Sequence, residues 1–252
     1  YKKYNHLTGL GLCYNALGLL SSDEKKWDES LKYFNDQIMI SRRTGDFEGA
    51  IASYNNIAII YFKQKDYASA RKYFMKVLRF SEKLGHKLAY STALLNIGLM
   101  EYIRGNFPEA LEYYHKKLSI SEELEDFRGM MNAYNNIATI MFDTGEYVKA
   151  VEYFLKNIGI SEKLGMNYQI AGAHYNIAQA YSVNFELEKS FRHAFISLSI
   201  YKKEKDAGDM SKIYNYIGYL YQKQGDLSKA AKMSSEAVRI MNDRKDDGVY
   251  HE

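Results

Sequence analysis

Two pairs of adjacent asparagines inside apolar runs are the residues of this sequence whose chemistry best suits binding. Asn55 and Asn56 interrupt the stretch SYNNIAII, and Asn135 and Asn136 interrupt the similar stretch AYNNIATI. A side-chain amide donates and accepts hydrogen bonds at the same time, which matches the N–H and C=O groups of an extended polypeptide. The pairs therefore indicate recognition of a backbone, provided that the surrounding elements present them on a common surface.

The sequence contains residues that can take part in catalysis, but they do not form any of the usual catalytic or metal-binding motifs. The six histidines include no H-E-x-x-H pair and have no cysteine partner at metal-ligand spacing, so we expect each to lie on the surface or to pack. No G-x-x-x-x-G-K-[ST] or G-x-G-x-x-G motif occurs, and acidic stretches such as SEELEDF from Ser121 are typical of solvated helix ends. We therefore expect no enzyme activity, no metal and no cofactor.

Composition narrows the class of partner and the location. The formal charge is only +3, from 34 basic and 31 acidic side chains among 252 residues, which argues against nucleic acid as a partner of this segment. The sequence has no run of about 18 apolar residues that could insert into a membrane. The single cysteine, Cys13, excludes an internal disulfide and fits a reducing compartment, so we expect a cytoplasmic protein in which Cys13 is a buried small hydrophobe.

A repeat with a period of 40 residues organises the whole chain. The tripeptide NIA or NIG recurs at this spacing, and ALG and YIG continue the register toward both ends. The six copies of this landmark begin at Ala16, Asn56, Asn96, Asn136, Asn176 and Tyr216.

Each copy has the pattern of two helices joined by a short turn. Apolar and small residues at i, i+3, i+4 and i+7 predict one buried helical face, and the pattern occurs twice in a copy. In the second copy these positions are Tyr54, Ile57, Ala58 and Tyr61, then Tyr67, Ala70, Phe74 and Val77.

The residues between the two helices have the chemistry of helix ends. Gly105 and Gly145 suit the left-handed conformation that terminates a helix, and Asp66 and Asn106 suit the cap of the next one. The only proline, Pro108, falls in the first turn of its helix, where a missing N–H costs little. Each copy is therefore expected to be an antiparallel hairpin.

Small residues recur in two columns, which indicates that the helices of a hairpin cross closely. The first column is Gly18, Ala58, Gly98, Ala138, Ala178 and Gly218, and the second, twelve residues later, is Ser30, Ala70, Ala110, Ala150, Ser190 and Ala230. A single hairpin cannot bury both of its faces, so we expect six stacked hairpins with a continuous core.

These columns resemble the tetratricopeptide repeat, whose pattern is W-x2-L-G-x2-Y followed by A-x3-F. The resemblance spans roughly residues 4 to 243, and the second copy fits with Tyr54 in the place of Trp. The fifth copy departs most, with His174 at the first aromatic place, Phe185 at the turn glycine and Ala194 at the final aromatic. The period of 40 exceeds the family's usual 34, and the repeat-ending proline is absent.

This longer form, with its NN-I-A or N-I-G core, is similar to the repeats of kinesin light chains, animal spindle-orientation adaptors and bacterial peptide-pheromone receptors, including Rap-type phosphatases. Similar arrays also occur as sensory segments of bacterial histidine kinases and transcription regulators. The resemblance implies an all-α, right-handed α-solenoid of six helical hairpins at residues 1–243. The expected repeats are about 4–45, 46–85, 86–125, 126–165, 166–205 and 206–243. Because the chain opens without methionine and closes on a charged stretch, we expect a fragment, with 244–252 as a tail or a linker to a missing domain.

The resemblance also implies that the first helix of each hairpin lines a concave groove. Asn56 lies about 100° around its helix from Ile57, off the core-facing stripe, so its amide is expected to face the groove. The predicted ladder is Asn56, Asn96, Asn136 and Asn176, with Asn55 and Asn135 in a less regular second column. Further along this wall the predicted contacts are Thr139, Gln179, Phe62, Tyr102, Phe142 and Lys63.

Both parts of this wall have an alternative interpretation. The amides can instead bond a neighbouring turn or bridge adjacent hairpins, as asparagine ladders in repeat arrays do. The aromatic residues can instead pack on the neighbouring repeat. A ligand with an acidic C-terminus is disfavoured, because the places where family members carry Lys or Arg hold Asn, Ile or Leu here.

The function expected from these features is that of a non-catalytic module that binds a protein or peptide segment, as the sensory or scaffold part of a larger signalling protein. One alternative is a regulatory input unit of a Rap-like phosphatase, histidine kinase or transcription regulator. Another is a structural array that associates with itself, which would make the protein a homo-oligomer.

Overall fold

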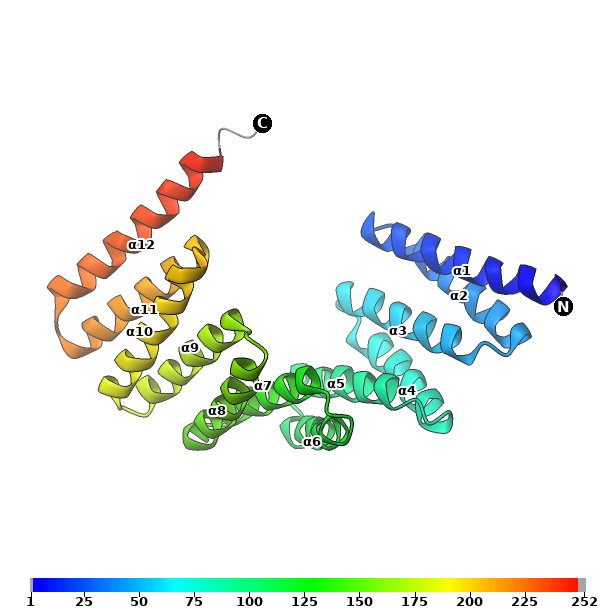
Figure 1. Ribbon diagram of the computed structural model, residues 1–252, viewed down its shortest axis with the longest axis horizontal. Helices are drawn as coiled ribbons and strands as arrows, with labels where there is room; N and C mark the ends of the chain where they lie inside the picture. Colours follow the sequence, from blue (N-terminus) through cyan, green and yellow to red (C-terminus); the bar gives the residue numbers. More distant parts are fainter. Residues whose placement is uncertain (1, 249–252) are drawn as a thin grey trace. The chain divides into compact units, whose positions relative to one another are not determined.

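The protein is helical throughout the residues that the structure describes. The computed structural model describes the backbone of residues 2–248 and the side chains of residues 6–243. This part of the chain contains twelve α-helices and no strand (Figure 1), so the all-α prediction is confirmed. None of the described helices combines the length and the apolar character that crossing a bilayer requires.

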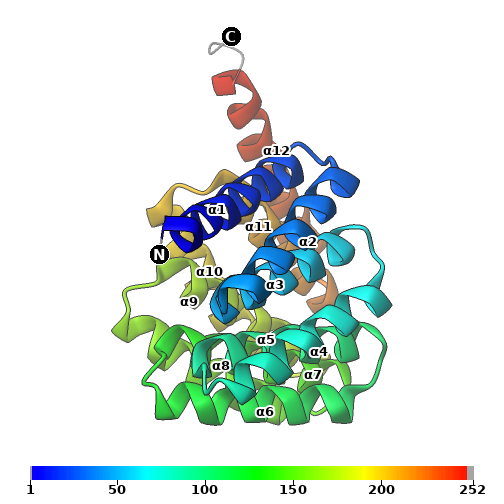
Figure 2. The ribbon, with the colours of Figure 1, turned by 90° about the vertical axis from the view of Figure 1, so that its right-hand side faces the viewer.

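The chain divides into two compact units, with the boundary between Glu125 and Asp126. Unit 1 contains α1 (Lys2–Asp23), α2 (Trp27–Thr44), α3 (Phe47–Lys63), α4 (Tyr67–Lys83), α5 (Lys87–Ile103) and α6 (Phe107–Glu123). Unit 2 contains α7 (Phe127–Asp143), α8 (Tyr147–Lys163), α9 (Asn167–Val183), α10 (Leu187–Glu204), α11 (Ala207–Gln224) and α12 (Leu227–Gly248). Consecutive helices of a unit pack against each other, as Figure 2 shows for α1, α2 and α3.

Each unit therefore holds three hairpins, and the fold is the predicted α-solenoid type with about six repeats. The limits of the individual repeats remain a prediction. Helix α12 runs on to Gly248 and so takes in the first residues of the expected tail at 244–252, of which 249–252 lie outside the described residues.

Left-handed residues end the first helix of the hairpins, as the glycines predict. Gly105 has φ +78° and Gly145 has φ +82°. Phe185 adopts φ +61° at the equivalent place in the fifth repeat, although a side chain disfavours this conformation. The Phe185 side chain is 90% exposed, so the turn geometry holds there without help from packing.

The two predicted helix caps have different outcomes. The Asp66 carboxylate accepts a hydrogen bond from the Ser69 backbone N–H at 3.0 Å, as expected of a cap. Asn106 is the N-cap residue of α6, as predicted, but its side chain makes no cap bond and its Nδ2 donates instead to Glu101 Oε2 at 2.9 Å. Pro108 lies in the first turn of α6, as predicted.

Glu101 explains why Asn106 is diverted from the cap. This carboxylate is 2% exposed and also accepts a hydrogen bond from Arg71 Nε on α4. Burial alone would raise the pKa of Glu101, but the bonds from Asn106 and Arg71 and the charges of Arg71 and Arg104 hold it below its usual value. A buried charge needs such partners, and this need outweighs one exposed helix cap.

The small-residue columns lie where the helices of a hairpin cross. Ser30 Oγ on α2 donates to the Gly18 carbonyl on α1 at 2.6 Å, and Ser190 Oγ on α10 donates to the Ala178 carbonyl on α9 at 2.7 Å. A side chain can bond the backbone of a facing helix only when the two backbones approach closely, so these contacts measure the tightness of the crossing.

The core of each unit consists of the apolar columns of the repeat. The isoleucine after the amide column is completely buried at every described repeat but the first, with 0% exposure at Ile57, Ile97, Ile137, Ile177 and Ile217. A tyrosine pair joins the two helices in three hairpins, with ring centroids 6.2 Å apart for Tyr14 and Tyr33, 6.2 Å for Tyr54 and Tyr73, and 6.1 Å for Tyr134 and Tyr153.

The prediction of a buried Cys13 is wrong, because its side chain is exposed on α1. The equivalent residue of the next repeat, Ser53, is 0% exposed because α2 packs against α3 there, and its hydroxyl bonds Gln37 of α2. Within the described residues no hairpin packs on α1 in this way, so a residue of core type is left in contact with solvent.

The crossing in the third hairpin leaves no room for a methyl group. A Cβ at Gly98 would lie 2.7 Å from a ring carbon of Tyr114, so we expect Gly98→Ala to destabilise unit 1 by about 1–3 kcal/mol. The matched control is Gly159→Ala, in the helix interior of α8 with nothing within 4 Å, which should stabilise by about 0.5–1 kcal/mol. Urea unfolding followed by circular dichroism measures both, and a Gly98→Ala protein at least as stable as the wild type would refute the close crossing.

Candidate functional site

The predicted amide ladder lies on the first helices of the hairpins. Asn56 on α3 and Asn96 on α5 belong to unit 1, while Asn136 on α7 and Asn176 on α9 belong to unit 2. All four side chains are half-buried, and each directly precedes an isoleucine with 0% exposure. The amides therefore lie at the edge of the core, where one side of each group meets solvent.

One member of the ladder bridges adjacent hairpins. Asn56 Nδ2 lies 3.4 Å from Asn15 Oδ1, so two amides 41 residues apart make a long hydrogen bond between α3 and α1. This is the arrangement of the alternative interpretation, in which amides hold the stack. It uses one of the two N–H groups of Asn56 and leaves the oxygen available to another group.

Asn55, in the less regular column, borders a cavity of about 300 Å³ in unit 1. Its Oδ1 is buried and has no hydrogen-bond partner in the described part of the chain. A buried acceptor without a donor is unfavourable, which makes Asn55 a place where a ligand N–H would add a missing bond. The walls of the cavity come from α3, α4 and the start of α5, and they consist of Glu48, Ile51, Ala52, Asn55, Val77, His86, Leu88, Ala89 and Thr92.

His86, Glu48 and Thr92 are members of this cavity that the sequence did not single out. His86 occupies the N-cap of α5, where its Nδ1 accepts a hydrogen bond from the Ala89 backbone N–H at 3.3 Å. Its Nε2 lies 4.0 Å from a carboxylate oxygen of Glu48. The repeat could have shown that His86 caps a helix, because the N-cap positions 40 residues earlier and later hold Asp46 and Asp126.

The predicted aromatic contacts have a structural role inside their own hairpins. Phe62, Tyr102 and Phe142 each pack on the aromatic residue that opens the second helix of the same hairpin. The ring centroids are 5.8 Å apart for Phe62 and Tyr67, 5.8 Å for Tyr102 and Phe107, and 5.5 Å for Phe142 and Tyr147. All three are half-buried, so the exposed side of each ring can still contribute to a ligand surface.

The three remaining predicted residues also have partners within the fold. Thr139 donates its hydroxyl hydrogen bond to the Asn135 carbonyl one turn earlier at 2.9 Å. Burial raises the pKa of Tyr175, and the side chain of Gln179 one turn later opposes this rise. The ammonium of exposed Lys63 lies 5.8 Å from the centroid of the Trp27 ring. Asn135 is half-buried on α7, next to Asn136.

In the fifth repeat a histidine pair takes the place of the tyrosine pair. His174 on α9 and His193 on α10 occupy the positions of Tyr54 and Tyr73, and their Nδ1 atoms are 2.8 Å apart. One ring donates to the other, so both are partnered packing residues, which agrees with the expectation for histidines in this sequence. The ring of Tyr181 packs on His193 at 5.6 Å.

The environment of this pair favours uncharged rings. Burial, with a smaller effect from His193, lowers the pKa of His174 to about 4. Burial and then the charge of Arg192 lower the pKa of His193. Within the described residues no group of three or more His, Cys, Asp or Glu side chains could hold a metal ion.

Comparison with known proteins gives the same architecture. The family model for the tetratricopeptide repeat matches residues 10–83 and 89–163. BtubC (BKLC) from P. vanneervenii is 18% identical with a TM-score of 0.75, over 90% of this chain and 94% of that chain. RapI, solved in its apo form, is 15% identical with a TM-score of 0.66, over 94% of this chain and 85% of that chain.

A third solved structure is larger than this chain. The STAND protein PH0952 from Pyrococcus horikoshii, which has a tetratricopeptide repeat sensor, is 16% identical with a TM-score of 0.80. The match covers 94% of this chain and 38% of that protein. No curated protein matches the sequence significantly. At these identities the similarity to solved structures describes the fold alone.

The histidine pair predicts a stability that depends on pH in unit 2. Folding lowers the pKa of both histidines below the unfolded value of about 6.5, so the folded state binds fewer protons than the unfolded state. The free energy of unfolding of unit 2 is therefore at its full value above about pH 6.5. This free energy should fall by on the order of 2 kcal/mol as the pH falls from about 6.5 toward about 4. Hydrogen exchange of α9 and α10 peptides at pH 7.5 and 5.0 measures this loss.

The matched control restores the tyrosine pair of the other repeats. A His174→Tyr, His193→Tyr variant should show far less acid-dependent opening of α9 and α10 than the wild type. Equal acid sensitivity in both proteins would show that other groups are responsible.

Proposed function

Because the chain belongs to the tetratricopeptide repeat family, we propose that it is a non-catalytic module that binds an extended protein or peptide segment along its first helices. The family is generally a non-catalytic, protein-binding fold. The observation that carries the proposal is the cavity bordered by Asn55, a residue whose amide oxygen is buried and has no donor within the described part of the chain. A small rotation of the Asn55 side chain into the cavity would let a bound backbone or side-chain N–H supply the donor.

The amide ladder extends the same chemistry beyond this cavity. The first helices carry one half-buried amide each, directly before a fully buried isoleucine, at Asn56, Asn96, Asn136 and Asn176. An extended segment presents N–H and C=O groups alternately, and an amide can pair with either. Asn135 adds a second amide beside Asn136, in the place that Asn55 takes beside Asn56.

The side chains around the amides would select among ligands. Phe62, Tyr102 and Phe142 offer the exposed parts of half-buried rings to apolar groups, while Thr139 and Gln179 add polar atoms. Lys63 adds an exposed charge near Trp27. The Asn15–Asn56 bond supports a mixed role in which the first rung also ties two hairpins together.

The wider setting of the proposal is a larger signalling protein in the cytoplasm, with this module as its sensor or scaffold. The similarity to PH0952, whose repeats are described as a sensor, supports this setting. The similarity to RapI over 85% of that chain favours one alternative, a regulatory input unit of a Rap-like phosphatase. In both cases the surface formed by the first helices binds a protein segment or a peptide, and the signalling activity belongs to another part of the protein.

The test begins with a peptide that the wild-type protein selects from a random library, whose dissociation constant is then measured with purified variants. Asn96→Ala and Asn136→Ala, alone and together, each remove an amide worth about 0.5–1.5 kcal/mol as a hydrogen-bond partner. The double variant should bind about tenfold more weakly or worse.

The matched control is Asn35→Ala on α2, a second helix, where the exposed amide bonds its own helix at the Leu31 carbonyl. Its affinity should equal that of the wild type. If the double variant also binds like the wild type, with unchanged helicity, the ladder only holds the stack and the proposed surface is wrong.

A further inference from the structure

Three residues that line the Asn55 cavity follow one side of α3. Glu48, Ala52 and Asn55 are spaced by four and three positions, so they lie one above the other along the helix. At the rise of an α-helix, Glu48 and Asn55 are about 10 Å apart along the axis. The carboxylate and the amide therefore mark two separated ends of one wall, with the methyl group of Ala52 between them.

The polar groups of the cavity are mostly acceptors of hydrogen bonds. The Oδ1 atom of Asn55 is buried and has no donor within the described residues. Thr92 donates its own hydroxyl hydrogen to the Leu88 carbonyl at 3.0 Å, so its oxygen can only accept a further bond. Glu48 adds a carboxylate, which accepts and does not donate. These groups match a ligand side chain that donates several hydrogen bonds and accepts none.

The fold does not neutralise the carboxylate of Glu48. Among the residues that line the cavity, Glu48 alone is charged when histidine is neutral, and its side chain is 82% exposed. Within the described residues its one ion-pair contact is with Nε2 of His86 at 4.0 Å, which is longer than a hydrogen bond. Nδ1 of His86 already accepts the Ala89 backbone N–H as the cap of α5. The carboxylate is therefore available to a cation of the ligand.

Apolar side chains form the rest of the cavity wall. Ile51 and Val77 are buried, while Leu88 is 60% exposed on α5 across from α3. Such a surface suits the CH2 groups of a long side chain whose charged end stays in contact with water. The volume of about 300 Å³ is at the lower end for ligand pockets, so the cavity suits one side chain better than a whole ligand.

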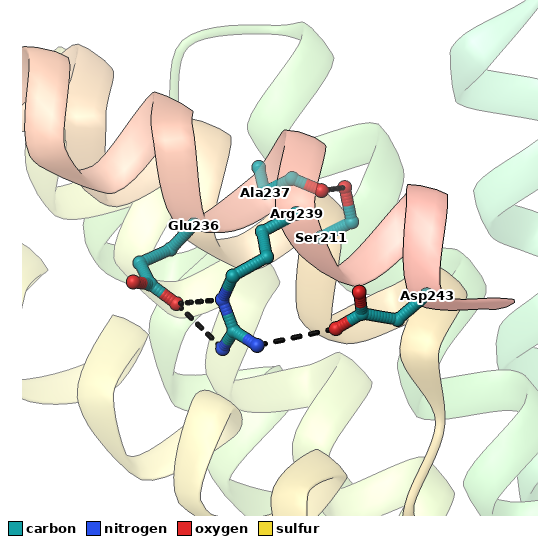
Figure 3. A network of polar contacts seen from close by, with 5 residues as sticks. All are labelled: Ser211, Glu236, Ala237, Arg239 and Asp243. Atoms are coloured by element: carbon teal, nitrogen blue, oxygen red, sulfur yellow. Dashed lines mark hydrogen bonds and ion pairs between the residues drawn. The ribbon is translucent and has the colours of Figure 1, made fainter.

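A cavity of about 520 Å³ in unit 2 does not have this combination of groups. Asp243 on its wall accepts a hydrogen bond from Arg239 at 3.1 Å (Figure 3), and Asp206 accepts the Asp209 backbone N–H at 2.9 Å. Both carboxylates therefore already have a partner. The same wall also carries two lysines, Lys202 and Lys205, which would repel a cation.

We propose that the Asn55 cavity selects a lysine or arginine side chain of the bound segment. The backbone N–H of that residue bonds the Asn55 amide oxygen. Its CH2 groups lie against Ala52 and Leu88, and its ammonium or guanidinium group reaches Glu48. Lysine and arginine combine a long apolar stem with several donors and no acceptor, as these walls require. The inference rests on the proposed function, because it assigns one residue of the bound segment to this cavity.

The first test compares the peptides that different variants select from a synthetic random library with acetylated N-termini. The wild type should enrich Lys or Arg at one position, and Glu48→Lys should enrich Asp or Glu at that position instead. The matched control is Glu109→Lys, which changes an exposed acid in the first turn of α6, a second helix of unit 1. Glu48 also lies in the first turn of its helix, so both variants lose the same interaction with a helix N-terminus. The control should select like the wild type.

The outcomes separate this inference from the proposed function. Selected peptides without a preference for Lys or Arg, or an unchanged preference in Glu48→Lys, would overturn the inference. The proposed function stands in that case if the Asn96→Ala, Asn136→Ala double variant still binds those peptides more weakly. A wild-type protein that selects no peptide at all would overturn both.

A second test measures whether the basic group meets Glu48. In a selected peptide, Lys is replaced by norleucine or Arg by citrulline, which keeps the length of the side chain and removes its charge. The wild type should bind the uncharged peptide about threefold to fivefold more weakly, as for an exposed ion pair, while Glu48→Gln should bind both peptides equally. The same loss of affinity in both proteins would show that the charge lies away from Glu48 and would overturn the inference.

Discussion

The close crossing of the two helices in each hairpin is the contact on which the other features of the fold depend. It requires small residues twelve positions apart, one on each helix, such as Gly18 and Ser30 or Ala178 and Ser190, and the hydroxyls of Ser30 and Ser190 reach the facing backbone. This pairing fixes the length of the turn and the rotation of each helix about its axis. The rotation then decides which residues face the core and which, like Asn56 and Asn96, lie at its edge.

Features that recur in the repeat were predictable from the sequence. The isoleucine column and the glycine turns occupy equivalent environments in successive hairpins, so the same physical requirement appears several times along one chain. The structure confirms them with 0% exposure at Ile57 and Ile97 and with a left-handed Gly105. The cap bond of Asn106 and the burial of Cys13, which the structure does not show, concern positions where the environment is not equivalent. Asn106 serves a buried carboxylate that this repeat alone places at Glu101, and Cys13 lies on a helix that no described hairpin precedes.

The candidate site could be predicted only to the level of the helix face. The 100° offset from Ile57 places Asn56 at the edge of the core, but its contact with Asn15 depends on the register between α1 and α3 and on two side-chain rotamers. The aromatic residues show the same limit. Phe62 packs on Tyr67, which opens the next helix, and also on a core cluster that includes Ile97 of the following repeat, while Phe142 packs on Tyr147. The Oδ1 atom of Asn55, which has no donor within the described residues, has no sequence signature, since a sequence does not show which buried atoms lack a donor.

One property of repeats explains how the wall beside the amides can differ from one repeat to the next. A hairpin cannot bury all of its sides, so the core columns must stay nearly constant while the positions that no neighbour covers are free to vary. Three residues after the amide column, the equivalent position of successive repeats holds side chains that are apolar, polar or aromatic. They are Ile59, Leu99, Thr139, Gln179 and Tyr219. Such variation allows one fold to distinguish ligands.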